Sequence, residues 1–274
     1  MKTRVKSGIL MLPFLLIIYF GGLPLTIAAA IIGFIGIQEF FRGWENIEVK
    51  PSKTVANVMI AILYAIHLIS ISVFDLTNSI YSRFFFCNLL MLWIAMSIAL
   101  SLVYGWKIDK RSAYDAVVTI IGIIYIGFFS YHLVLLDTLD KGYIFTWTVL
   151  ISSFGSDIFA YFTGYLIGKH KLAPILSPKK TIEGSIGGVA GAAILCGLYG
   201  FIFAKEYLVA CVIIGILGGI VSQAGDLTAS AFKRKMGIKD YGNLIPGHGG
   251  IMDRFDSVIF TSPFVYYFVN FFVN

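Results

Sequence analysis

The sequence has little charge for its length. Charged residues make up 13% of the 274 residues, about half the share in ordinary soluble chains, whereas hydrophobic residues make up 58%. A soluble domain needs polar groups to cover its surface, and a disordered chain is poor in apolar residues. The composition therefore excludes both classes and indicates an integral membrane protein.

Cysteine is also scarce. Cys87, Cys196 and Cys211 are the only three, and they form no CxxC pair. This excludes a disulfide framework and a cysteine-based zinc site. Each of the three lies in an apolar stretch, where cysteine usually acts as a small hydrophobic residue.

Long runs without charge are abundant instead. A membrane-spanning helix needs about 20 mostly apolar residues. The runs cover residues 7–38, 54–74, 84–106, 116–136, 142–156, 184–204, 207–225 and 257–274. The first run is long enough for two passes, with a break at the Gly-Gly-Leu-Pro of residues 21–24. The fifth run continues past Asp157 to Gly168.

These runs predict an all-α polytopic membrane protein with about nine transmembrane helices, the shortest over residues 9–20. We expect about five helices in residues 1–136. Residues 137–274 should hold about four, with two long inner loops at 168–184 and 223–256.

The basic residues indicate the orientation. Eighteen of the 21 fall in alternate connections, and the other three are Arg83, Lys141 and Lys205. Because cytoplasmic loops are enriched in Lys and Arg, we expect the N-terminus inside and the C-terminus outside. The net charge of +6 then comes from basic residues on the cytoplasmic side of the membrane, and we expect no nucleic-acid partner.

The longest inner loop, residues 223–256, carries most of the unusual polar residues. If the preceding helix continues into it, Ser222, Asp226, Ser230 and Lys233 form one polar stripe on that helix.

The end of this loop brings two acids together. Asp253 and Asp256 are three residues apart, on one face of the start of the last helix. Carboxylates this close repel each other unless a cation lies between them, and Mg²⁺ prefers such oxygen ligands.

A glycine-rich segment, Gly247-His248-Gly249-Gly250, precedes these acids. Glycines let the backbone approach a ligand closely, and amide groups at a helix start attract anions. Together with the acids and nearby bases, the segment is typical of a metal-phosphate site. The alternative is that acids simply favour helix N-termini while bases stay in the cytoplasm.

In the second loop, Ser177-Pro178 is typical of a helix start, which would put Lys179 and Lys180 in the first turn. Lysines placed against the helix dipole suggest a bound anion. The alternative is that they are ordinary lysines of a cytoplasmic loop.

Asp157 lies inside a predicted membrane helix, where an acid is a candidate functional residue. The alternative is a structural hydrogen bond to a neighbouring helix. The sequence assigns no role to Glu39, His67 or His132.

The polar residues of the C-terminal half form one extended pattern. It reads Ser230-x2-Lys233-Arg234-x4-Lys239-Asp240-x5-Pro246-Gly-His248-Gly-Gly-x2-Asp253-Arg254-x-Asp256, preceded by Ser156-Asp157, by Ser177-Pro-Lys179-Lys180-Thr181-x-Glu183-Gly184 and by Gln223-x-Gly-Asp226. This pattern resembles the signature of the phosphatidate cytidylyltransferases, also called CDP-diacylglycerol synthases. The first third of the chain resembles that family only as a hydrophobic string.

The resemblance implies transfer of the cytidylyl group of CTP to phosphatidic acid, which gives CDP-diacylglycerol and pyrophosphate. It also implies Mg²⁺, with a second cation possible, and a homodimer in the bacterial inner membrane. The active site would lie at the cytoplasmic face.

For this reaction we expect the following roles for individual residues. Asp226, Asp253 and Asp256 would hold the metal ion. The other catalytic residues would be Lys233, Arg234, Lys239 and His248. Binding of substrate and phosphate would fall to Ser177, Lys179, Lys180, Thr181, Ser222, Gly249, Gly250, Arg254 and Asp157.

Two other functions fit parts of the pattern. A transporter would also line a path with acids and bases, but it would more naturally show corresponding broken helices in two repeats. A CDP-alcohol phosphotransferase would share the metal and nucleotide chemistry, but its Asp-Gly-x2-Ala-Arg-x8-Gly-x3-Asp-x3-Asp array is absent.

Overall fold

The computed structural model describes residues 15–74, 80–245, 247 and 249–273 of the chain. Long helices dominate, and residues 15–20 are also helical. The helices are α2 (Gly22–Glu45), α3 (Lys53–Phe74), α4 (Ile80–Tyr104), α5 (Ala113–Ile121), the π-helix η1 (Gly122–Phe128), α6 (Phe129–Asp137), α7 (Gly142–Ile167), α8 (Ile182–Phe203), the 3₁₀ turn η2 (Lys205–Tyr207), α9 (Leu208–Lys235) and α10 (Met252–Phe272).

Seven of the described helical segments are long and apolar enough to cross a membrane. They match seven of the predicted runs, and α5, η1 and α6 together form one of them. The chain is therefore a polytopic, mainly α-helical membrane protein. The shortest predicted helix, over residues 9–20, lies mostly outside the described residues, so the count of nine stays a prediction.

The eighth segment, α10, has 21 residues but is not among those seven. Its sequence carries polar groups throughout, from Asp253 to Asn270. Many of its side chains are nevertheless buried, among them Val258, Ile259 and Val265. The polar side chains of its first half, among them Asp256, Ser257 and Thr261, are also buried, so they face protein instead of lipid.

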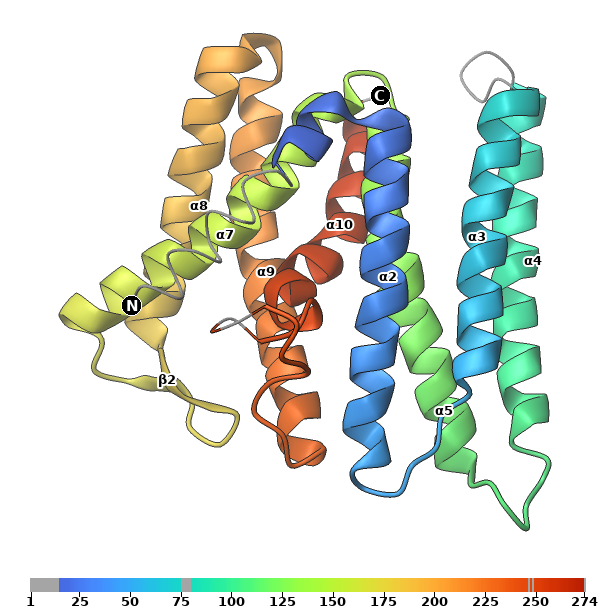
Figure 1. Cartoon of the computed structure of the whole chain (residues 1–274). Helices are drawn as coiled ribbons and strands as arrows, with labels where there is room; N and C mark the ends of the chain where they lie inside the picture. Colours follow the sequence, from blue (N-terminus) through green and yellow to red (C-terminus); the bar gives the residue numbers. More distant parts are fainter. Residues whose placement is uncertain (1–14, 75–79, 246, 248, 274) are drawn as a thin grey trace.

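The two ends of the bundle differ in their connections (Figure 1). The connections α2–α3 and α4–α5, the β-hairpin and the end of α9 lie at the lower end of the view. The connections α6–α7 and α8–α9 and the end of α10 lie at the upper end. The basic clusters of the described chain, such as Lys107, Lys110 and Arg111, therefore gather at one end.

The predicted inner loop over residues 168–184 does not begin a helix at Ser177-Pro178, so that prediction is wrong. Strands β1 (Lys171–Ala173) and β2 (Ser177–Thr181) form an antiparallel hairpin instead. Helix α8 starts only at Ile182, because Thr181 caps it by accepting a hydrogen bond from the backbone of Gly184 at 3.1 Å. Lys179 and Lys180 therefore lie on a strand that leads into the helix, not in its first turn.

Helices α7, α8 and α9 pack closely through small residues. A side chain at Gly215 of α9 would place its Cβ 2.7 Å from the Cα of Ala193 in α8. A side chain at Gly188 of α8 would place its Cβ 2.8 Å from the backbone oxygen of Ser156 in α7. Small residues allow such backbone contact within a membrane, and here they hold the three helices that carry the site.

We expect Gly215→Val to lower the thermal stability of the purified protein in detergent. The added side chain meets backbone atoms that cannot move aside, and overpacking of this kind costs about 1–3 kcal/mol. The matched control is Ala190→Val, on the exposed face of α8. An unchanged unfolding temperature for Gly215→Val would contradict the packing described above.

Candidate active site

A cleft of about 470 Å³ opens between α7, the hairpin, α8 and α9. This volume is in the range of small-molecule sites. The cleft combines acids, lysines, amide and hydroxyl groups and two tyrosines. Its lining residues are Asp157, Ala160, Tyr161, Gly164, Tyr165, Lys171, Leu172, Lys179, Lys180, Thr181, Gly184, Ser185, Gln223 and Asp226.

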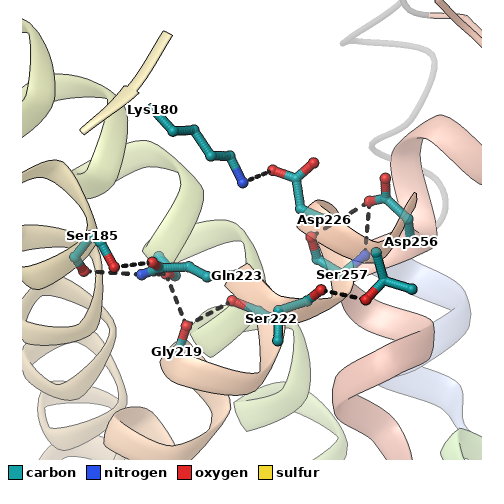
Figure 2. Close-up of polar contacts among 11 residues, drawn as sticks. Lys180, Ser185, Gly219, Ser222, Gln223, Asp226, Asp256 and Ser257 are labelled. Atoms are coloured by element: carbon teal, nitrogen blue, oxygen red, sulfur yellow. Dashed lines mark hydrogen bonds and ion pairs between the residues drawn. The ribbon is translucent and has the colours of Figure 1, made fainter. Parts of the chain in front are cut away.

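A hydrogen-bond network forms the floor of the cleft (Figure 2). The Gln223 amide nitrogen on α9 donates to the Ser156 hydroxyl of α7 and to the Ser185 carbonyl of α8, both at 3.0 Å. The Ser185 hydroxyl donates back to the Gln223 side-chain oxygen. All five polar groups are thus paired, which fixes three helices relative to one another.

Asp226 occupies the centre of the charged groups. On one side it forms an ion pair with Lys180 of β2, and on the other lies Asp256 of α10 (Figure 2). Asp226 and Asp157 both act on Asp256 as like charges, and Asp226 acts on Asp157 in the same way. Three carboxylates from three helices therefore gather, with Lys180, Lys233 and Arg254 as the opposite charges near them.

Asp256 itself is buried, with 6% of its surface exposed. Its Oδ1 accepts hydrogen bonds from the backbone nitrogen of Ser257, at 2.7 Å, and from its hydroxyl. No hydrogen bond among the described residues reaches Oδ2. This oxygen thus keeps its capacity to accept a cation or a donor.

A second ion pair lies on α9, two turns beyond Asp226. Lys233 Nζ is 2.9 Å from Asp253 Oδ1. The other oxygen, Asp253 Oδ2, accepts hydrogen bonds from the backbone nitrogens of Tyr241, at 2.7 Å, and Gly250, at 3.0 Å. Asp253 thus ties α9, the 236–251 loop and the start of α10 together.

Tyr241 supports this arrangement from within the loop. Burial raises the pKa of its phenol, which therefore stays protonated and donates to the Ala229 carbonyl at 3.1 Å. Its ring also lies under the Lys233 ammonium group, 5.2 Å from the ring centroid. The lysine is therefore held by a carboxylate and an aromatic face.

The remaining predicted bases lie around this core. Arg234 donates from Nε to the Leu176 carbonyl at the hairpin tip, at 3.3 Å. Arg254 acts on Asp157 as an opposite charge, and its Nε is buried without a hydrogen-bond partner among the described residues. Lys239 is exposed on the loop.

Other predicted site residues have local roles in the secondary structure. Ser222 is fully buried and donates to the Gly219 carbonyl of its own helix. Ser177 pairs with Ala173 in the hairpin. Gly249 has a φ of +87°, which favours glycine.

One predicted catalytic residue, His248, lies outside the described residues. Among those that are described, no three His, Cys, Asp or Glu side chains are placed to hold a metal ion by themselves. Mg²⁺ commonly uses only one or two carboxylates, with phosphate and water oxygens as its other ligands. Asp226 and Asp256 fit that requirement. Asp253 does so less well, because both its oxygens already accept hydrogen bonds.

Two residues from the N-terminal half reach this region, and sequence reasoning missed both. Glu39 of α2 is buried and accepts hydrogen bonds from the backbone nitrogens of Ile251 and Met252 at the start of α10. The sequence feature that could have indicated a role for Glu39 is an acidic residue within an apolar helix.

The second is Tyr125, in the π-helix η1. Its hydroxyl is buried without a hydrogen-bond partner among the described residues, within electrostatic reach of Asp256 and Asp226. A π-helix is often found at functional sites, but nothing in the sequence pattern indicated one here.

Comparison with known proteins gives a consistent result. Residues 2–272 match the model of the cytidylyltransferase family. The chain is 34% identical to a phosphatidate cytidylyltransferase of Bacillus subtilis, with 97% of each chain covered. It is 32% identical to one of Staphylococcus saprophyticus, with 96% of each covered.

A phosphatidate cytidylyltransferase of Synechocystis is 45% identical over 135 residues, which cover 48% of this chain and 45% of that protein. Both the family match and the two relatives above extend over nearly the whole chain. The chain therefore belongs to the cytidylyltransferase family and is a nucleotidyltransferase.

Proposed function

We propose that this protein transfers the cytidylyl group of CTP to phosphatidic acid and so makes CDP-diacylglycerol for phospholipid synthesis. The observation that carries the proposal is the cleft beside α7, where three lysines and two acids face one another at the basic end of a membrane bundle. A charged nucleotide from the cytosol and a charged lipid head group in the bilayer could both reach such a place. The names of the relatives support the same substrates.

The cleft lysines supply the charge that two phosphates need. Both substrates are anionic and repel each other, so a site that joins them must provide fixed positive charge. Lys171, Lys179 and Lys180 line the cleft, and all three lie on the hairpin. We assign them to the CTP phosphates and to the lipid phosphate.

Asp226 and Asp256 would hold Mg²⁺, with Asp157 nearby. The proposal is supported by carboxylates from separate helices that act on one another as like charges, even with Lys180, Lys233 and Arg254 nearby. A bound cation would reduce this repulsion. When bound, the ion would neutralise phosphate charge and make the pyrophosphate a better leaving group. Asp253 would instead position Lys233, which it holds at 2.9 Å.

The reaction itself needs little further chemistry from the protein. An oxygen of the lipid phosphate attacks the α-phosphorus of CTP, and the bond from that phosphorus to the bridging β-phosphate oxygen breaks. The lipid phosphate is already ionised at cytoplasmic pH, so no dedicated general base is required. Lys233, Arg234 and Lys239 would then stabilise the departing pyrophosphate.

The membrane arrangement completes the proposal. We propose nine transmembrane helices with the N-terminus in the cytoplasm and the C-terminus outside, in the inner membrane of a bacterium. The cleft would then open at the cytoplasmic face. The homodimer and the division of the chain at residue 137 also stay predictions.

The purified protein in detergent should release pyrophosphate from CTP only when phosphatidic acid and Mg²⁺ are both present. CDP-diacylglycerol should appear in equal amount, because each transfer frees one pyrophosphate. Enzymatic pyrophosphate detection and lipid chromatography measure the two products. Release of CMP, or no release at all, would refute the proposed reaction.

Asp226→Asn and Asp256→Asn should each lower turnover about 100-fold and raise the Mg²⁺ concentration needed for half-maximal rate. Asp253→Asn should lower turnover without raising that Mg²⁺ requirement, because it weakens the hold on Lys233 instead. Asp109→Asn, at an exposed inner loop, is the control. An unchanged Mg²⁺ requirement in the first two variants would remove both residues from the metal site.

The orientation can be tested with single cysteines in a variant in which Cys87, Cys196 and Cys211 are replaced. Lys110→Cys should react with a membrane-impermeant maleimide in inverted vesicles but not in intact cells. Lys205→Cys should react in intact cells, because it lies on the opposite side. The reverse labelling pattern would overturn the topology.

A further inference from the structure

We propose that Glu39 is a positioning residue for cytidylyl transfer, which sets the start of α10 and through it the site acids Asp253 and Asp256. This inference rests on the proposed function. It concerns the N-terminal half of the chain, to which the sequence assigns no role in the site.

Both oxygens of the Glu39 carboxylate are used. Oε1 accepts a hydrogen bond from the backbone nitrogen of Ile251 at 3.1 Å, and Oε2 accepts one from Met252 at 2.9 Å. The first amide groups of a helix have no acceptor within the helix. A carboxylate from α2 therefore satisfies two such amides at the start of α10, more than 200 residues away in sequence.

The Glu39 carboxylate is close to the loop backbone on one side, and Glu39 also lines a cavity of about 480 Å³ together with Arg42 and Gly242. Glu39 is only 4% exposed. A Cβ at Gly242 would lie 2.6 Å from Glu39 Oε1, and a Cβ at Gly250 would also collide with the carboxylate. The two glycines thus let the loop that leads into α10 approach the carboxylate closely.

The same short segment is held from its other side by Asp253. The backbone nitrogen of Gly250 donates to Asp253 Oδ2, while the next two nitrogens donate to Glu39. Three successive amides are therefore fixed by two carboxylates from different helices. The direction in which α10 leaves this point determines where Asp256 meets Asp226.

A purely structural anchor would not need a buried charge at this place. Burying a carboxylate is costly, and two neutral acceptors could satisfy the same two amides. The charge adds strength to each hydrogen bond and fixes the geometry more narrowly. A displacement of about 1 Å in a catalytic group can cost about 100-fold in rate, so narrow geometry matters here.

The test compares Glu39→Gln with Glu45→Gln. The Glu39→Gln variant keeps the size of the side chain but offers one acceptor where two are needed. Glu45 lies on the same helix, is half-exposed and forms an ion pair with Lys53 at 2.7 Å, so its variant controls for the loss of a glutamate charge from α2. Glu39→Asp, which keeps the charge on a shorter side chain, is the conservative variant.

We expect Glu39→Gln to lower kcat about 10- to 100-fold, with less than about threefold change in KM for either substrate and an unfolding temperature close to that of the wild type. Glu39→Asp should recover part of the lost kcat, and Glu45→Gln should match the wild type. A Glu39→Gln protein with wild-type kcat would overturn the proposal. So would a loss of activity that only follows a loss of folded protein.

Backbone hydrogen exchange gives a readout that does not depend on activity. Peptides that cover residues 249–253 should exchange faster in Glu39→Gln than in the wild type or in Glu45→Gln. Unchanged exchange would overturn the proposal even if activity fell. If the wild type itself released no pyrophosphate, the proposed function would fail, and the exchange result would still decide whether Glu39 holds the start of α10.

Discussion

The structure depends on the way in which α10 begins inside the bundle. In Figure 1 its first turn lies well above the lower ends of α2 and α9, so its free amide groups cannot all turn to water. Glu39 and Asp253 supply the acceptors, and the 236–251 loop folds around them. This solution brings two carboxylates into an apolar region, one of which, Asp253, pairs with Lys233.

Helix α9 connects the two charged parts of the site. Asp226 and Lys233 lie on it two turns apart, one paired with Lys180 of the hairpin and the other with Asp253 of α10. The hairpin tip is tied to the same helix through Arg234. A single rigid element thus fixes the distance between the lysine-rich cleft and the start of α10.

Much of this architecture could be predicted from the sequence, because lipid constrains composition strongly. The apolar runs located seven of the helices. Helix α9 continues to Lys235, which meets the condition under which Ser222, Asp226 and Lys233 share one stripe. The prediction failed at Ser177-Pro178. A serine followed by proline is typical of a helix start, but here the segment pairs with β1.

What the sequence determined by itself is which residues must avoid lipid: nine of the 21 bases, and most of the candidate site acids, lie in residues 168–184 and 223–256. Only the tertiary structure decided which of them meet. It placed Asp226 between Lys180 and Asp256, tied Asp253 to Lys233, and brought Glu39 to α10. The physical reason is range: burial is a property of each segment, whereas a hydrogen bond or an ion pair requires two distant segments to come within a few ångströms of each other.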